Sequence, residues 1–309
     1  MSILYLILGI ALLYAGGEFL VRHASLLASR FGISSLVIGL TVVAFGTSAP
    51  ELAATLASAL DGAPDLAIGN VIGSNIANVA LILGIAALIY PVSAGKLFLK
   101  RDFPVMMAVS LLLIPFMLDG VVSRLEGGIL VGLLIAYLVY LLKYDQSQLA
   151  ADDLPSEPKG PVWQNIVLLI LGIGLLIAGA RLLVIGAIAI ATRLGVPEAV
   201  IGLTVVAFGT SLPELASSVI AASKKQSDIL LGNVIGSNIF NVLAILGITA
   251  LVKPLAEPFA AIRLDILIML GFSLALLPLF IVGTRGRLGR VPGGLLFAAY
   301  LTYIVLLFT

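Results

Sequence analysis

The chain has 309 residues, of which 61% are hydrophobic and only 11% are charged, and its mean hydropathy is +1.21. This composition excludes an ordinary soluble domain and is typical of a protein that crosses a membrane several times. The net charge of +1 excludes the basic footprint of a nucleic-acid-binding protein, and the absence of cysteine excludes disulfides, thiolate metal sites and a cysteine nucleophile.

Apolar stretches follow one another along the chain, and most are near the ~20 residues needed to cross the hydrocarbon core of a bilayer. We predict an all-α membrane protein with ten transmembrane helices, five in each half. In chain order the stretches are Ile3–Val21, Leu36–Leu60, Ile68–Ile89, Pro104–Leu118, Gly128–Leu142, Ile166–Ile190, Ala199–Ala222, Ile229–Val252, Ile266–Val282 and Gly293–Phe308. The first stretch is not expected to be a cleaved signal, because no charged segment precedes it.

The two halves of the chain are copies of each other. Residues 38–88 and 201–251 align without a gap at an offset of 163, with 33 identities in 51 positions. Weaker matches at the same offset extend the duplication over nearly the whole chain: Pro91 with Pro254, Asp102 with Asp265, Arg124 with Arg287, and Tyr137 with Tyr300. Because each half has an odd number of helices, the second half enters the membrane in the opposite sense. We therefore predict two inverted five-helix repeats, over residues 1–144 and 162–309.

The segment 145–161 between the halves is the only polar linker. It is acidic and contains three prolines, which indicates a solvated tether, with a weak attraction for cations as the alternative. The loops after the odd-numbered helices hold 12 of the 17 basic residues. The positive-inside rule then places the linker in the cytoplasm and both termini outside.

The first duplicated motif places a carboxylate beside a predicted helix break. Pro50 removes a backbone donor and pushes away the carbonyl group of Gly46, so the helix is expected to be broken here. At membrane depth such a break is tolerated where the freed backbone is buried or lines a wet cavity. Thr47, Ser48 and Glu51 share one helical face, and their oxygens are ligands that hard cations prefer. The second copy repeats the arrangement with Thr210, Ser211, Pro213 and Glu214.

The second motif adds a polar stripe to an apolar helix. Asn70, Ser74 and Asn78 are four residues apart and lie on one face. The other copy has Asn233, Ser237 and Asn241, and glycines at 69, 73, 232 and 236 favour close helix packing.

Some of these polar groups have structural interpretations. Thr41 and Thr204 are expected to bond their own backbone, and Asn70 and Asn233 to join helices. Neither motif contains a basic residue, so Glu51 and Glu214 need a cation or a proton.

Four further polar or aromatic residues fall near the predicted helix ends. His23 and Trp163 are expected to lie at the level of the lipid headgroups. Asp102 and Asp265 are expected to be helix caps or to form loop ion pairs.

Taken together, the paired GTS-PE and GSNI-N motifs resemble the α-repeats of the cation/calcium antiporter superfamily, specifically the prokaryotic sodium/calcium exchangers. The resemblance covers essentially the whole chain. It implies one central site of four sub-sites that holds one Ca²⁺ or three Na⁺ in alternation. The ligands that it implies are the carboxylates of Glu51 and Glu214, the backbone carbonyls of Thr47, Thr210, Ala44 and Ala207, the oxygens of Ser48, Ser211, Ser74 and Ser237, and, beside the middle sub-site, Asn78 and Asn241.

The resemblance also implies the coupling. Potassium-dependent relatives typically carry aspartate where this chain has Asn241, so exchange is expected not to require K⁺. Three Na⁺ against one Ca²⁺ makes the expected exchange electrogenic, across the plasma membrane, with Ca²⁺ and Na⁺ as the transported ions and no cofactor, enzymatic activity or protein partner.

A proton-coupled exchanger of Ca²⁺ or another divalent cation is the alternative, although the GNA-E motif of that branch is absent. An intramembrane hydrolase is disfavoured, because it needs a nucleophile with a base or a metal-bound water.

Overall fold

The computed structural model describes residues 2–145, 161–195, 207–282 and 286–307. This part of the chain is almost entirely helical, which confirms the predicted class. Within it, seven helices are long and apolar enough to cross a membrane, and two further segments that meet at a 46° bend make an eighth candidate span.

The first half of the chain forms helices that correspond to the first five predicted stretches. Its elements are α1 (Ser2–Phe31), α2 (Ser35–Ile38), η1 (Gly39–Val43), α3 (Ala44–Thr47), α4 (Ala49–Leu60), α5 (Pro64–Ile76), η2 (Ala77–Ile82), α6 (Leu83–Ile89), β1 (Val92–Ser93), η3 (Phe98–Asp102), α7 (Phe103–Met117), β2 (Val121–Val122) and α8 (Arg124–Asp145), where η denotes a π-helical segment.

The second half follows the same order. Its elements are α9 (Val162–Arg193), α11 (Ala207–Thr210), α12 (Leu212–Ser223), α13 (Ser227–Phe240), η6 (Asn241–Leu246), α14 (Gly247–Val252), β3 (Leu255–Ala256), α15 (Phe259–Val282), β4 (Arg287–Leu288) and α16 (Arg290–Leu307). The bounds of α12 are those of α4 moved by 163 positions.

Two small antiparallel sheets connect the halves to each other. β1 pairs with β4 through Val92 and Leu288, and β2 pairs with β3 through Val122 and Leu255. Each sheet therefore takes one strand from each half.

The last helix of each half shows that the offset between the copies changes. Arg124 donates a hydrogen bond to the Val252 carbonyl, and Arg290 donates one to the Ile89 carbonyl, both at 3.4 Å. The two acceptors are 163 positions apart, but the two donors are 166 apart. Three additional residues lie between β3 and β4 relative to the connection between β1 and β2. The predicted matches of Arg124 with Arg287 and of Tyr137 with Tyr300 are therefore wrong, and the equivalents are Arg290 and Tyr303.

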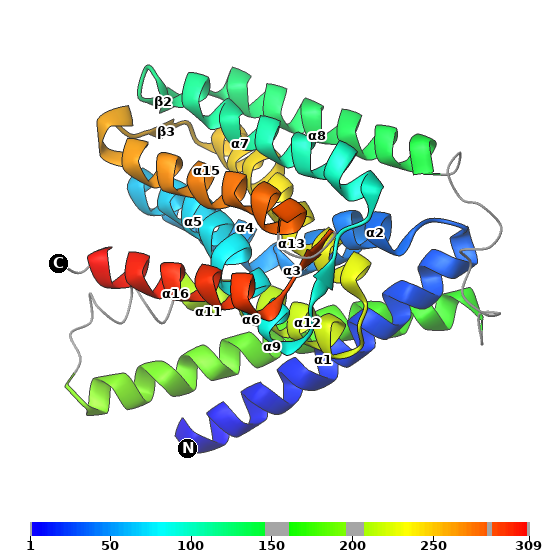
Figure 1. The fold of residues 1–309 in the computed structure, drawn as a ribbon. Coiled ribbons are helices and arrows are strands. Elements are labelled where there is room, and N and C mark those ends of the chain that lie inside the picture. The colour runs from blue at the N-terminus through cyan, green and yellow to red at the C-terminus, as the bar shows by residue number, and fades with distance from the viewer. Residues whose placement is uncertain (1, 146–160, 196–206, 283–285, 308–309) are drawn as a thin grey trace.

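Helices α1 and α9 cross in close contact at glycine positions. A Cβ atom added to Gly16 would lie 2.7 Å from the Leu176 nitrogen, and one added to Gly9 would lie 2.9 Å from the Gly179 oxygen. Gly172 and Gly179 are the equivalents of Gly9 and Gly16, so the contact is symmetric. Figure 1 shows the two helices side by side along one side of the molecule. Such close backbone contact couples them into one unit.

A single methyl group at this crossing is expected to destabilise the protein. In Gly172→Ala the new Cβ would lie 2.7 Å from the Leu20 nitrogen. Overpacking of this kind costs about 1–3 kcal/mol, so the melting temperature in detergent should fall. Gly174→Ala is the control on the same helix, because no described atom lies within 4 Å of its Cβ position. Equal melting temperatures for the two variants would contradict the close contact.

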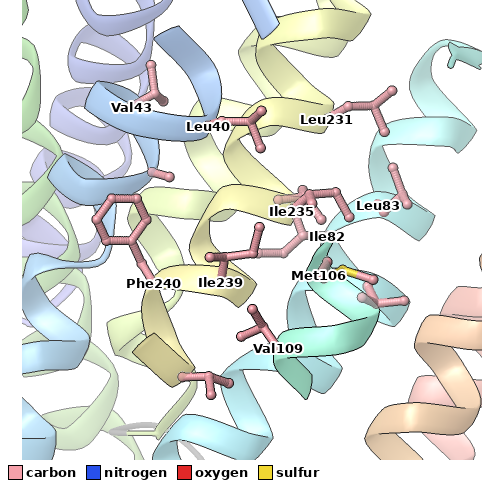
Figure 2. Packing of buried hydrophobic residues seen from close by; sticks show 14 of the residues in the cluster. Leu40, Val43, Ile82, Leu83, Met106, Val109, Leu231, Ile235, Ile239 and Phe240 are labelled. Carbon is pink, nitrogen blue, oxygen red and sulfur yellow. The ribbon is translucent and has the colours of Figure 1, made fainter. Parts of the chain in front are cut away.

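Helix α13 lies in the centre of the core. Every residue from Ile229 to Phe240 is buried. Figure 2 shows Leu40 and Val43 of η1 on one side of α13, and Met106 and Val109 of α7 on the other. The GSNI-N motif of α13 is therefore surrounded by other helices on all sides.

The predicted close packing at glycine is confirmed for Gly232 and Gly236. Their added Cβ atoms would lie 2.6 Å from the Leu36 oxygen and 2.7 Å from the Ala44 Cβ. Gly69 and Gly73 have no described atom within 4 Å. The equivalent of the segment 36–44 is 199–207, of which only Ala207 is described, so the prediction for Gly69 and Gly73 falls largely outside the described residues.

Candidate ion-binding site

Both GTS-PE motifs break their helices at serine, as predicted. α3 ends at Thr47 and α4 begins at Ala49, with Ser48 between them. In the second half α11 ends at Thr210 and α12 begins at Leu212. Pro50 and Pro213 fall in the first turn of the new helices, where their missing N–H groups have no intrahelical partner to lose. Glu51 and Glu214 lie in the same first turns, where the helix dipole favours negative charge.

The serine of each half binds the glutamate of the other half. Ser48 Oγ donates to Glu214 Oε1 at 3.0 Å, and Ser211 Oγ donates to Glu51 Oε1 at 3.2 Å. The serines of the second motifs are next to them, with Ser237 Oγ 3.1 Å from Ser48 Oγ and Ser74 Oγ 3.5 Å from Ser211 Oγ. The two halves therefore build one shared site rather than two separate ones.

The asparagines make a second set of bonds between the halves. Asn78 Nδ2 donates to Asn238 Oδ1, and Asn241 Nδ2 donates to Asn75 Oδ1, both at 2.9 Å. Asn75 and Asn238 were not among the residues predicted from the sequence, because they lie off the stripe of four-residue spacing. The signal that could have found them is their identical place in both copies of the GSNI-N motif.

Four buried oxygens of this site accept no hydrogen bond in the described part of the chain: Glu51 Oε2, Glu214 Oε2, Asn78 Oδ1 and Asn241 Oδ1. The two glutamates are only 2% and 1% exposed. A buried polar atom without a partner is costly, and a buried carboxylate is much more so. No lysine, arginine or histidine among the described residues forms a salt bridge with either glutamate. The donor set contains only oxygen, which suits hard cations such as Ca²⁺ and Na⁺.

The remaining predicted ligands lie on the short helices that precede the two breaks, α3 and α11. Thr47 Oγ1 bonds the Ala44 carbonyl at 3.3 Å and Asn233 Oδ1 at 3.0 Å. The Ala44 carbonyl also accepts from the Ser48 nitrogen at 3.0 Å. In the second half, Ala207 and Thr210 are the first and last residues of α11.

The structural interpretations of the other polar residues can be checked directly. Asn70 donates to Thr55 at 2.8 Å and Asn233 donates to Ser217 at 3.0 Å, which confirms that they join helices. Thr41 bonds its own backbone at the Val37 carbonyl, 2.7 Å away, as predicted. Thr204 lies outside the described residues.

The predictions for residues away from the site are partly confirmed. His23 is buried and bonds Asn165 Oδ1, near the start of α9, at 2.8 Å. Its side chain therefore faces a neighbouring helix, and its level in the membrane stays a prediction. Asp102 forms the predicted ion pair with Arg101, but the pair is buried. Asp265 accepts a hydrogen bond from Tyr303 at 3.4 Å. Trp163 is exposed near the start of α9, where a headgroup anchor is expected.

A buried cluster of oxygen atoms shared by two halves of a helical membrane protein is typical of cation transporters. The comparisons with known proteins agree. The model of the sodium/calcium exchanger protein family matches residues 1–143 and 164–309, and the chain belongs to this family. Its members are antiporters, which are secondary transporters rather than enzymes.

Individual relatives match over nearly their whole length. The sodium/calcium exchanger MaX1 of Methanosarcina acetivorans is 36% identical over 99% of this chain and 98% of its own. The inner membrane protein YrbG of Escherichia coli is 36% identical over 98% and 95%. A solved structure of the sodium-calcium exchanger NCX_Mj superposes with a TM-score of 0.86 at 35% identity, and covers 98% of this chain and 97% of that one.

Proposed function

We propose that this protein exchanges Na⁺ for Ca²⁺ at the buried site shared by Glu51 and Glu214. The observation that carries the proposal is the set of four unpartnered oxygens: two from carboxylates and two from asparagine amides. Two carboxylates balance one Ca²⁺, whereas three Na⁺ leave one surplus positive charge. The exchange is therefore electrogenic in this proposal. The family match and the names of MaX1 and NCX_Mj support Ca²⁺ and Na⁺ as the transported ions.

The ligand roles in this proposal follow the two motifs. Glu51 and Glu214 are shared between the ions, and the carbonyls of Thr47 and Thr210 complete the Ca²⁺ position. The outlying Na⁺ positions use the carbonyls of Ala44 and Ala207 and the hydroxyl groups of four serines: Ser48, Ser211, Ser74 and Ser237. Asn78 and Asn241 flank the middle. The symmetric bonds from Ser48 and Ser211 support an assignment that treats both halves alike.

The architecture in this proposal is two inverted five-helix repeats, over residues 1–144 and 162–309, joined by the cytoplasmic linker 145–161. The symmetric crossing of α1 and α9 and the exchanged strand pairs support it. The distribution of basic residues places both termini outside the plasma membrane. The match to an inner membrane protein supports that membrane.

The alternative function is exchange of a divalent cation for protons carried by Glu51 and Glu214. Proteoliposomes distinguish the two. Ca²⁺ uptake should follow an outward Na⁺ gradient at equal pH on both sides, and a pH gradient without Na⁺ should drive none. Uptake that follows the pH gradient alone would replace Na⁺ with protons as the coupling ion.

Potassium is not expected to be required for exchange. The position of Asn241 carries an amide, so the site lacks the additional negative charge that the potassium-dependent relatives are expected to have there. Na⁺-driven Ca²⁺ uptake in K⁺-free buffer should equal uptake with added K⁺. The variant Asn241→Asp gives a comparison in which the additional charge is present. Strict dependence of the unmodified protein on K⁺ would show that the subfamily assignment is wrong.

A further inference from the structure

The α1–α9 pair packs unequally on the two copies of the broken helix. Gly17 of α1 lies against α12, since an added Cβ would be 3.0 Å from Ile220 Cγ1 and 3.4 Å from the Ala216 oxygen. The equivalents of Ala216 and Ile220 on α4 are Ala53 and Ala57, which are both exposed. The pair therefore covers α12 and leaves the matching face of α4 open.

An ion pair lies at the covered contact. Glu18, the neighbour of Gly17, pairs with Lys224, which directly follows α12. The side chains are 38% and 29% exposed, so the pair is partly shielded from water. The ion pair therefore links α1 to the end of α12, the helix that carries Glu214.

The equivalent positions carry the opposite charges. At the offset of 163, Glu18 corresponds to Arg181 on α9, and Lys224 corresponds to Asp61 directly after α4. A change of sign at only one position would have left two like charges facing each other. Both positions differ in sign between the copies, so the charges of both combinations, Glu18 with Lys224 and Arg181 with Asp61, attract each other.

The second combination is not closed in this structure. Arg181 and Asp61 are both exposed and form no salt bridge with each other. Glu18 and Arg181 lie on opposite sides of the crossing, because α1 and α9 run antiparallel, with Gly9 on Gly179 and Gly16 on Gly172. A second cation lies near Asp61, because Lys253 Nζ donates to the carbonyl of the adjacent residue, Leu60, at 3.2 Å.

We propose that Glu18–Lys224 and Arg181–Asp61 are two alternative latches, each of which holds the α1–α9 pair at one end of its movement. This inference rests on the proposed exchange, which requires the shared site to open to one side at a time. When the pair leaves α12 and covers α4, the first ion pair opens and the second closes. An exposed ion pair is weak, so each latch biases the equilibrium without locking it.

Crosslinking of paired cysteines tests the two positions. The native chain has no cysteine, so Glu18→Cys with Lys224→Cys and Arg181→Cys with Asp61→Cys can be made without background. A short, reducible bifunctional thiosulfonate is applied to the full chain in nanodiscs, and crosslinks are measured by mass spectrometry. Both pairs should crosslink, and their yields should move in opposite directions as Na⁺ is replaced by Ca²⁺ or by neither ion.

The control is Glu18→Cys with Asp61→Cys, a combination that the proposal never brings together, because Glu18 pairs with Lys224 after α12 whereas Asp61 follows α4. If Arg181→Cys with Asp61→Cys crosslinks no better than this control under every ion condition, the second latch does not exist. In a protein that carries all four cysteines, a molecule with both crosslinks at once would show that the two contacts are not alternatives.

Charge exchange separates a latch from a merely structural contact. In the Glu18→Cys, Lys224→Cys background, Arg181→Glu places two acids together and should raise the first crosslink about threefold at low salt. Adding Asp61→Arg restores attraction and should return the yield to its starting value. If the added Asp61→Arg does not return the yield, the effect is not electrostatic and the proposal is wrong.

Crosslinking requires no exchange, so its failure leaves the proposed function intact. Absence of Na⁺-driven Ca²⁺ uptake by the unmodified protein would overturn that function separately.

Discussion

Glutamine in place of Glu51 or Glu214 is expected to abolish exchange, with Ca²⁺ flux reduced by roughly 100-fold or more in either single variant. Each carboxylate has one oxygen bonded to the serine of the other half and one oxygen that accepts no hydrogen bond from the described residues. Glutamine keeps the volume but removes the charge and replaces an oxygen with an NH₂ group, which cannot bind a cation. Because the two halves build one site, loss of either carboxylate should be as severe as loss of the other.

The control for this prediction is Glu257→Gln, in the connection between β3 and α15, where the Glu257 backbone N–H donates to the Gly120 carbonyl and its carboxylate has no partner among the described residues. It should keep near-native flux. The Glu51→Gln and Glu214→Gln proteins should elute as monodisperse species in detergent, which shows that they fold. Near-native flux in either would mean that the site does not depend on both carboxylates.

Leucine in place of Asn238 is expected to reduce exchange about 10-fold or more, because it removes the acceptor of the Asn78 hydrogen bond and leaves the buried Asn78 amide unpaired. Asn238 Oδ1 is the acceptor for Asn78 Nδ2 at 2.9 Å, and this bond holds the unpartnered Asn78 Oδ1 in place. Asn75→Leu should have a similar effect through Asn241. These two residues are positioning residues, so the half-saturating Ca²⁺ concentration should rise as well.

Asn165→Leu provides the control, because Asn165 is also a buried asparagine whose Oδ1 accepts a side-chain hydrogen bond, from His23, but it lies between α1 and α9. It should lower stability more than it changes Ca²⁺ affinity. If Asn238→Leu and Asn165→Leu shift the half-saturating concentration equally, the asparagine bonds between the halves do not organise the site.

The helical class, both helix breaks and the structural roles of Thr41, Asn70 and Asn233 were predicted correctly, because these depend on local features of the sequence. Proline at the first turn of a new helix and a carboxylate beside it are visible in a single segment. The hydrogen bonds from Ser48 to Glu214 and from Ser211 to Glu51 were not predictable, since they depend on how two distant segments are placed in space. Residue spacing on one helix also favoured the stripe that contains Asn78 and excluded its neighbour Asn75.

The duplication gave the correct equivalences only where no residues had been inserted. Between β3 and β4 the second copy is three residues longer, and identities by chance, such as Arg124 with Arg287, hid the change. The matching bonds from Arg124 to Val252 and from Arg290 to Ile89 revealed it. The partner of His23, Asn165, was likewise not predictable, because it depends on the packing of α1 on α9.

The most direct test of the central claim is the flux of Ca²⁺ into proteoliposomes that contain the purified protein. With Na⁺ inside and none outside, the vesicles should take up Ca²⁺, and a potassium-selective ionophore that sets the membrane potential should change the rate, because the exchange moves net charge. With equal Na⁺ on both sides at zero potential, uptake should fall to the level of empty vesicles. Uptake that does not depend on the Na⁺ gradient would contradict exchange at the site shared by Glu51 and Glu214.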